Sequence, residues 1–130
     1  MGWSLTDVGN RYMELCDLAP QDPLAFEELM GMFTEDVQTT LLHVSAPEKK
    51  MTGRAELAAM YRFFFESGPR FKHLWNVNEL SGNSIEMPYV FVLRQSDGSL
   101  SVSGGADRFV FAPDGRIAEL TNEQKFFIHL

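Results

Sequence analysis

The second half of the chain consists of four long apolar segments that are separated by tight-turn signals. These segments cover residues 70–80, 85–95, 99–112 and 116–128. The connections read Ser-Gly-Asn at 81–83, Ser-Asp-Gly at 96–98 and Pro-Asp-Gly at 113–115. Strands joined by such short turns pair as antiparallel neighbours. The sequence therefore predicts a four-stranded meander, with a bulge where Gly104–Gly105 interrupts the third segment.

Helical spacing dominates the first half. Ser4 and Asp7 form a capping-box pattern that begins a helix, and Pro20 ends it. Asp22–Pro23 begin a second helix, whose apolar stripe reaches Phe33 and which ends at residues 34–36. A strand is expected over 37–44, and a third helix from Gly53 to about residue 66. This order predicts one α+β domain over residues 1–130, with three helices packed on one face of a strongly curved antiparallel sheet.

Charge and composition exclude several kinds of partner. The formal net charge is -7, and the only paired basic residues are Lys49–Lys50, so nucleic acid and acidic membrane surfaces are not expected partners. No stretch is long and apolar enough for a membrane span. Cys16 is the single cysteine, which rules out an internal disulfide, and the first residues lack the basic start and apolar run of a signal peptide. A cytoplasmic location is expected.

The layout resembles a known superfamily over nearly the whole chain. Local matches are Asn10-Arg-Tyr12, Met32-Phe-Thr-Glu-Asp36, Gly53-Arg-Ala-Glu-Leu57, Asp107-Arg-Phe-Val-Phe111 and Asp114-Gly-Arg-Ile117. In this order and spacing they are similar to the ketosteroid isomerase and polyketide cyclase-like (SnoaL-like) superfamily, which shares its cone-shaped fold with nuclear transport factor 2 (NTF2). The resemblance implies an NTF2-like fold. It implies less about activity, because this fold carries isomerases, dehydratases, cyclases, hydrolases and simple binders.

The resemblance also implies a site. In ketosteroid isomerases a tyrosine of the first helix and a protonated aspartate of a late strand hold an oxyanion, and a tyrosine of the third helix supports the first. The matching residues are Tyr12, Asp107 and Tyr61. A carboxylic acid in an apolar cage keeps its proton and can donate a hydrogen bond to an enolate-like oxygen; this enzyme is a standard example of that effect. The aspartate that serves as the base is replaced here by Leu41, which cannot move a proton.

Two histidines are candidates for the missing base. His43 follows Leu41 on the same strand face, and His73 is flanked on its face by Phe71 and Trp75. A histidine at the position of His73 also resembles the one in scytalone dehydratase-like members of the superfamily. The Asp-Arg-Asp set of limonene epoxide hydrolase-like members is not matched. We expect a small apolar ligand to contact the following residues: Leu41, Phe71, Trp75, Tyr89 and Phe109.

Each candidate has a structural interpretation as well. Tyr12 and Tyr61 lie on apolar helix stripes and His43 suits a hydrogen-bonded core position, while Asp107 suits a surface pair beside the two glycines. No metal site is expected, because the three histidines are scattered and have no carboxylate at ligand spacing. No cofactor is expected, since no glycine-rich phosphate loop is present.

Two functions therefore stay open at the level of sequence. The first is a cofactor-independent isomerase, dehydratase or cyclase that acts by acid–base chemistry on a small apolar carbonyl compound, with Tyr12 and Asp107 on the oxygen and His73 or His43 moving the proton. The second is a non-catalytic module that binds an apolar ligand or mediates dimerisation. A homodimer through the outer sheet face is expected from the resemblance, with Phe126 and Ile128 on the contact face.

Overall fold

The computed structural model describes residues 3–130, and in this range the chain forms three helices, α1 (Leu5–Leu18), α2 (Pro23–Gly31) and α3 (Arg54–Glu66). The predicted caps are present. The Ser4 hydroxyl accepts a hydrogen bond from the Asp7 N–H at 3.1 Å, and the Asp7 carboxylate accepts one from the Ser4 N–H at 3.2 Å. At α2 the Asp22 carboxylate accepts from the Leu24 N–H at 3.0 Å. These contacts satisfy N–H groups that have no partner inside a helix.

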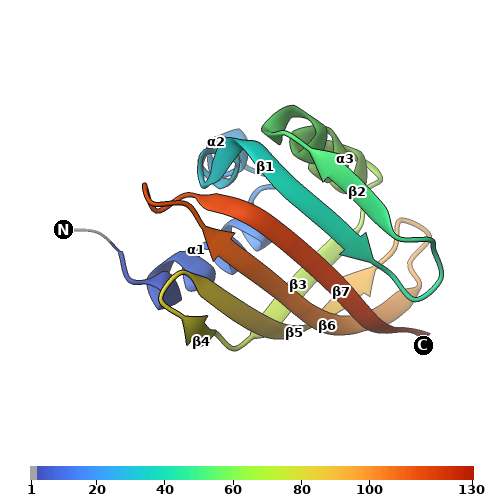
Figure 1. The fold of residues 1–130 in the computed structure, drawn as a ribbon. Helices are drawn as coiled ribbons and strands as arrows, with labels where there is room; N and C mark the ends of the chain where they lie inside the picture. The colour runs from blue at the N-terminus through green and yellow to red at the C-terminus, as the bar shows by residue number, and fades with distance from the viewer. Residues whose placement is uncertain (1–2) are drawn as a thin grey trace.

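The remaining elements of residues 3–130 are strands of one sheet. Their bounds are β1 (Phe33–Leu42), β2 (Lys49–Thr52), β3 (Arg70–Trp75), β4 (Asn78–Ser81), β5 (Ser84–Arg94), β6 (Leu100–Phe111) and β7 (Ile117–His129). The order across the sheet is β2-β1-β7-β6-β5-β3, with β4 paired to β5 beside β3 (Figure 1). The meander over β5, β6 and β7 is antiparallel, as predicted.

The structure corrects four details of the sequence prediction. β1 begins at Phe33, which the sequence pattern places in the stripe of the second helix, and it ends at Leu42. β2 was not predicted. The segment 70–80 is two strands, which both pair with β5 and are separated at Asn76–Val77. β1 pairs with β7 in parallel, so the sheet is mixed; no tight turn joins these two strands, and turn signals therefore carried no information about their direction.

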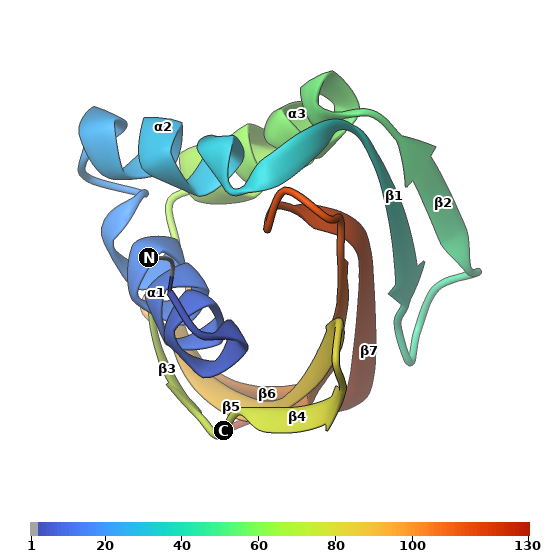
Figure 2. The same cartoon turned by 60° about the vertical axis from the view of Figure 1, so that its left-hand side comes forward.

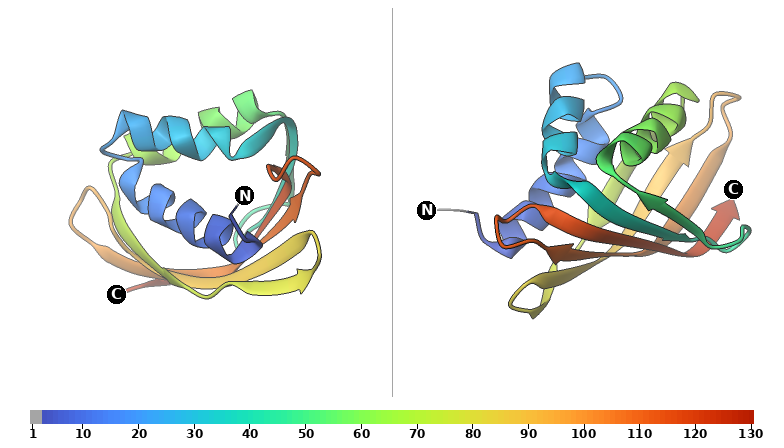
Figure 3. Two further views of the ribbon diagram at one scale, coloured as in Figure 1. Left: turned by 90° about the vertical axis from the view of Figure 1, so that its left-hand side faces the viewer. Right: turned by 45° about the horizontal axis from the view of Figure 1, so that its top comes forward.

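The sheet bends strongly and stays open, with β2 and β3 at its two ends. Figure 2 shows it curled around α1, and α2 and α3 lie over the remaining open side, which gives the cone shape that Figure 3 shows from two further directions. α1 approaches the sheet closely at Gly9, where an added Cβ would lie 2.9 Å from Ile85 and 3.0 Å from the sulfur of Met87. The core lies between the helices and the concave face.

A register shift interrupts the pairing of β6 with β7 at the predicted Gly104–Gly105 position. Gly104 pairs with Phe126 and Gly105 with Gln124, so the extra residue is Lys125 of β7. The shift reverses the alternation along β7. As a result Gln124 and Phe127 both line the interior, whereas Phe126 faces outward across Gly104.

Between residues 3 and 130 no helix is both long and apolar enough to cross a membrane. The same residues contain no group of three or more histidine, cysteine, aspartate or glutamate side chains placed to hold a metal ion.

Candidate functional site

A cavity of about 310 Å³ lies between α1, α3 and the concave face of the sheet. Most of the residues expected at the site line this one cavity: Tyr12, Leu41, His43, Tyr61, Phe71, His73, Tyr89 and Asp107. They come from seven different elements or loops, and the bend of the sheet is what brings them together. A volume of this size is at the lower end of the range for small-molecule sites.

Two of the expected ligand contacts lie elsewhere. Trp75 is half-buried, but β3 ends at this residue and its indole N–H donates to the side chain of Asn10 on α1 at 2.9 Å. Phe109 is fully buried beneath the cavity, where its ring meets Tyr12 edge-on with centroids 4.8 Å apart. Alternation placed both residues on the correct face of the sheet. It did not show how far along the strand the cavity extends.

Tyr12 and Tyr61 form a hydroxyl pair at the helix side of the cavity. Both side chains are buried, and their hydroxyl groups share a hydrogen bond between α1 and α3. Burial raises the pKa of each phenol well above its ordinary value, so both stay protonated at neutral pH. One hydroxyl hydrogen closes the pair, and the other is free for a ligand oxygen.

Asp107 is the buried carboxyl group of the cavity, and only 6% of it is exposed. Its Oδ1 accepts a hydrogen bond from the side-chain amide of Asn122 at 2.7 Å. Burial raises the pKa of Asp107 to about 6, although the Asn122 bond and the charges of His73 and His43 oppose the rise. This carboxyl group therefore changes its protonation state close to neutral pH.

Asn122 of β7 joins three of the site residues. Its amide nitrogen donates to Asp107 and also to the Tyr89 hydroxyl, at 2.9 Å. Its amide oxygen lies 2.8 Å from His43 Nε2, and since an amide oxygen only accepts, this nitrogen of His43 carries the hydrogen. His43 itself is exposed at the rim of the cavity.

His73 is paired with a carboxylate that the sequence reasoning did not identify. Its Nδ1 lies 2.6 Å from Asp17 Oδ1, and its backbone N–H donates to Asp17 Oδ2 at 3.2 Å. Burial alone would raise the pKa of Asp17, but the hydrogen bonds and charge of His73 outweigh it and hold that pKa below its ordinary value. An ionised carboxylate only accepts, so Nδ1 carries the hydrogen and Nε2 is left to accept a proton.

Aromatic rings surround the histidine. His73 stacks on Phe91 with ring centroids 4.9 Å apart, and Phe71 meets it edge-on at 5.6 Å. Phe71 in turn stacks on Phe64 and Phe65 of α3. The Asp17–His73 pair thus has an apolar border, and its two side chains are only 10% and 14% exposed.

The polar residues form a row across the concave face. In the order of the strands they are His43 just after β1, Asn122 on β7, Asp107 on β6, Tyr89 on β5 and His73 on β3. Hydrogen bonds connect the first four, and the rings of Tyr89 and His73 lie 6.0 Å apart. The row therefore brings an acid of raised pKa and a carboxylate-supported base into one cavity, which is the equipment for moving a proton on a bound molecule.

Asp17, Asn122 and Gln124 are lining or supporting residues that the sequence reasoning missed. Asp17 follows the buried Met13 by four residues, which puts it on the inward side of α1. Asn122 and Gln124 follow the buried Leu120 at a period of two. The signals were present as polar residues on apolar faces, but they became informative only once their partners were known.

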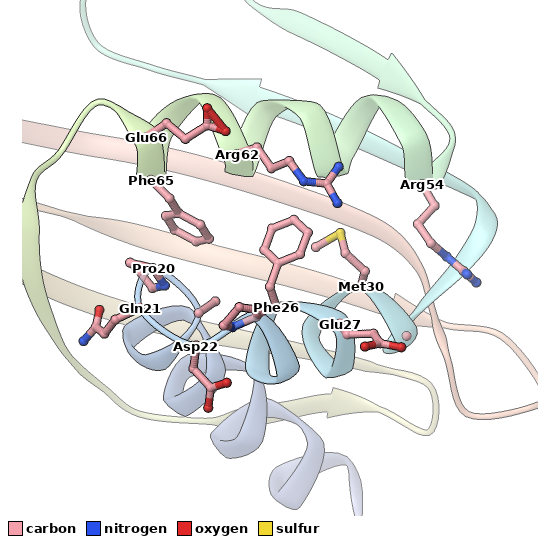
Figure 4. Close-up of a pocket in the computed structure, with 13 residues that line it drawn as sticks. Pro20, Gln21, Asp22, Phe26, Glu27, Met30, Arg54, Arg62, Phe65 and Glu66 are labelled. Carbon is pink, nitrogen blue, oxygen red and sulfur yellow. The ribbon is translucent and has the colours of Figure 1, made fainter.

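A larger hollow of about 880 Å³ lies outside, between α2 and α3 (Figure 4). Phe26, Met30 and Phe65 line it, and Arg62 lies over the Phe26 ring at 4.7 Å. The remaining charges on its border are of both signs, from Arg54, Glu27 and other side chains (Figure 4). None of the acidic or basic side chains that line it is buried, so the inner cavity is the candidate site despite its smaller volume.

Comparison with known proteins gives structural matches only. No protein-family model matches the sequence, and no curated protein matches it significantly. Among solved structures, an NTF2-like protein of unknown function from Exiguobacterium sp. 255-15 superposes with a TM-score of 0.77 at 23% identity, over 91% of this chain and 98% of that one. A Δ5-3-ketosteroid isomerase from Mycobacterium sp. gives 0.75 at 14% identity, over 95% and 96%.

A third solved structure contains a ligand. It is RV0760c from Mycobacterium tuberculosis in complex with estradiol-17β-hemisuccinate, with a TM-score of 0.75 at 12% identity over 94% of this chain and 95% of that one. At these identities the matches establish the architecture and leave the activity open. Their scores and near-complete coverage agree with the element order, the bent sheet and the position of the helices. This chain has the NTF2-like fold.

Proposed function

We propose that the protein is a cofactor-independent isomerase, dehydratase or cyclase that acts on a small apolar molecule with a carbonyl group. The observation that carries this proposal is the Asp17–His73 pair at 2.6 Å, in the same cavity as Asp107 and the Tyr12–Tyr61 pair. A core histidine needs no carboxylate partner and no apolar cavity in front of it. A general base benefits from both, since the carboxylate stabilises the imidazolium and the cavity receives the substrate.

Proton transfer would follow from the geometry in two steps. His73 Nε2 takes a proton from a carbon next to the substrate carbonyl, the electron pair of that C–H bond forms a carbon–carbon double bond, and the π pair of the carbonyl moves to its oxygen. Tyr12 and the protonated form of Asp107 donate hydrogen bonds to this oxygen as its charge develops. The imidazolium then returns the proton, either to another carbon or to a leaving hydroxyl group, which separates isomerisation from dehydration.

A non-catalytic ligand-binding module is the second candidate. Leu41 lines the cavity at the position that the resembling isomerases use for their base, and this favours a site that only binds. RV0760c was solved with a steroid ester, which supports an apolar ligand of this general kind. The binding module and the enzyme share the cavity, so binding alone does not distinguish them.

Exchange of carbon-bound hydrogen distinguishes the two functions. The protein is incubated with 2-tetralone, a small bicyclic ketone, in deuterated buffer, and deuterium at the carbons next to the carbonyl is followed by NMR or mass spectrometry. We expect exchange well above the buffer rate, a loss of on the order of 10²-fold in His73→Asn, and a smaller loss in Asp17→Asn. His129→Asn is the control, because His129 contacts Ser101 and does not line the cavity.

Each outcome of this experiment points to a different function. Exchange that depends on His73 supports the enzyme. Saturable binding of 2-tetralone with exchange at the buffer rate would support the binding module instead. Exchange that is equal in wild type and His73→Asn would remove His73 as the base.

We further propose that the molecule forms a homodimer through the outer face of the sheet. Phe126 and Ile128 are 36% and 50% exposed on that face, next to other apolar side chains of β3, β5 and β6. A twofold contact between copies would cover this surface.

A further inference from the structure

Asn122 occupies the centre of the polar row, and it makes three hydrogen bonds with three different elements. It reaches Asp107 on β6, Tyr89 on β5 and His43 after β1, at 2.7, 2.9 and 2.8 Å. Its side chain has two donor hydrogens and one acceptor oxygen, and all are used. A polar surface side chain has no need for such a set. The full use of the amide indicates a residue that fixes the orientation of its neighbours.

The three hydrogen bonds of Asn122 determine which atoms of its partners stay available to a ligand. Asn122 occupies Oδ1 of Asp107, which leaves Oδ2 as the oxygen for a ligand. It donates to the oxygen of Tyr89, so the hydroxyl hydrogen of Tyr89 is free to donate. It also holds His43 as the Nε2–H form.

We propose that Asn122 is a positioning residue, which turns Asp107 Oδ2 and the Tyr89 hydroxyl hydrogen toward a ligand oxygen and so sets the hydrogen-bonding arrangement of the cavity. This inference deepens the proposed function and rests on it for the identity of the ligand as a carbonyl compound. It adds Tyr89 as a second hydroxyl donor, on the wall opposite Tyr12. The site then suits a ligand oxygen that accepts several hydrogen bonds at once, as a carbonyl or enolate oxygen does.

Asp107 is the group through which this role can be measured. The titratable groups that face it come from α1, α3, the two strands β3 and β5, and the segment after β1: Tyr12, Cys16, Tyr61, His43, Tyr89 and His73. The phenols and the thiol stay neutral near pH 6, because burial raises the pKa of each. The Asn122 bond favours the carboxylate form of Asp107, so removing the bond should raise the pKa of Asp107 above about 6.

The first measurement needs neither a variant nor a ligand. Nitrogen-15 NMR of the wild-type imidazoles above pH 8 reports which ring nitrogen carries hydrogen. We expect His43 to be the Nε2–H tautomer, because Asn122 Oδ1 accepts from that nitrogen. A dominant Nδ1–H form would overturn the arrangement around Asn122.

The second measurement compares Asn122→Leu with Gln124→Leu. Gln124 is two residues further along β7 and lines the same cavity, but it donates to Ser103 and has no hydrogen bond to Asp107. Carbon-13 NMR of the Asp107 carboxyl group gives its titration directly. We expect the titration midpoint to rise by roughly one unit in Asn122→Leu and to stay in place in Gln124→Leu.

The pH dependence of 2-tetralone binding is the third readout. A ketone oxygen only accepts hydrogen bonds, so binding should strengthen as Asp107 becomes protonated, and the midpoint of this pH profile should rise in Asn122→Leu alone. An Asp107 titration that superposes on wild type in Asn122→Leu would overturn the proposal. If the protein does not catalyse the deuterium exchange of 2-tetralone described above, the catalytic function is removed. The two NMR measurements on His43 and Asp107 still test the role of Asn122 in that case.

Discussion

Leu41 is the residue at which this cavity departs most clearly from a steroid isomerase. Its side chain lines the cavity, and in the sheet it pairs with Asn122 of β7. A leucine at that point makes the wall apolar where the resembling enzymes have a carboxylate. In the proposed mechanism His73 moves the proton instead, and its Nδ1 is hydrogen-bonded to Asp17.

We predict that the wild-type protein does not convert a Δ5-3-ketosteroid to its conjugated isomer, because the side chain at position 41 cannot accept a proton. Leu41→Asp should give measurable conversion, which the absorbance of the conjugated ketone reports. Leu42→Asp is the matched control, since Leu42 is the next residue of β1 and its side chain is not part of the cavity wall. Efficient turnover by wild type would show that Leu41 does not occupy the place of the base.

Asp107 should make stability depend on pH in an unusual direction. Its pKa in the folded protein is about 6, above the ordinary value of 3.8. The folded state therefore holds the proton more tightly than the unfolded state, so this group contributes most stability below about pH 4 and loses that contribution as the pH rises through 6. The loss amounts to roughly 3 kcal/mol, at 1.36 kcal/mol per pKa unit.

Asp107→Asn removes this titration and keeps the shape of the side chain. We predict that the free energy of unfolding of Asp107→Asn, relative to wild type, increases by on the order of 2–3 kcal/mol between pH 4 and pH 7.5. Urea unfolding at several pH values measures it. Asp114→Asn should show a trend of opposite sign, because hydrogen bonds with Arg116 lower the pKa of Asp114. If the free energy of unfolding had the same pH dependence in wild type and in Asp107→Asn, the raised pKa of the buried Asp107 carboxyl group would be contradicted.

Site residues differed in how far they could be identified from sequence. Tyr12, Tyr61 and Asp107 came from the family resemblance, and strand alternation gave inward faces to His73 and Phe109. Asp17 could not be assigned a role, because its partner His73 lies 56 residues away and no local pattern connects them. The same holds for Asn122 and its contacts after β1 and on β5 and β6, since such networks are created by the packing of distant segments.

At the scale of elements, caps and turn signals in the sequence correctly predicted the helix starts and hairpin turns that local interactions determine. The caps at Ser4 and Asp22 and the tight turns of the meander are decided within a few residues, and the structure confirms them. Phe33 had helical spacing, but its position is determined by pairing with Ile117 of β7, far along the chain. β2 is a short polar edge strand whose identity also comes from its partner, β1. Long-range pairing overrides local pattern in both cases.

The shift between β6 and β7 depends on the absence of a side chain at Gly105. A Cβ there would lie 1.9 Å from the backbone oxygen of Glu123, and backbone cannot move aside as a flexible side chain can. We predict that Gly105→Ala lowers the free energy of unfolding by roughly 3 kcal/mol. Denaturant unfolding measures the loss.

Gly31→Ala provides the comparison for this prediction. Gly31 is the last residue of α2, and an added Cβ would meet nothing within 4 Å. Alanine also favours a helix over glycine, so stability should stay constant or rise by a few tenths of a kcal/mol. Equal effects of Gly31→Ala and Gly105→Ala would mean that the close approach at the shift does not constrain the sheet.

At the scale of the whole molecule, the two faces of the sheet carry different kinds of side chain. The concave face encloses the cavity and carries the polar row. The convex face has an outer apolar patch, which we define as Leu74, Val90, Val92, Val102, Phe126 and Ile128. Strand pairing aligns its members: Leu74 with Val90, Val90 with Gly104 and Gly104 with Phe126, and beside them Val92 with Val102 and Val102 with Ile128.

The outer apolar patch is large for a surface that faces water. Leu74 is 69% exposed, Val92 52% and Ile128 50%, and they lie on three different strands rather than singly. Contiguous apolar surface of this kind is characteristic of protein contacts. Ion pairs of Arg108 with Glu86 and Glu123 border it on the same face, so the centre is apolar and the rim charged, which is the usual anatomy of an interface.

We predict a homodimer in which the outer apolar patch of one copy covers that of the other. Size-exclusion chromatography with light scattering should give twice the monomer mass at concentrations on the order of 100 μM for a contact of roughly 800 Å² per partner. The double variant Val92→Lys with Ile128→Lys should be monomeric, because each copy would bring two charges into the apolar centre. Leu24→Lys is the control: Leu24 is 75% exposed but belongs to α2, away from the sheet. A wild-type monomer at that concentration, or a double variant that stays dimeric, would mean that the convex face does not hold two copies together.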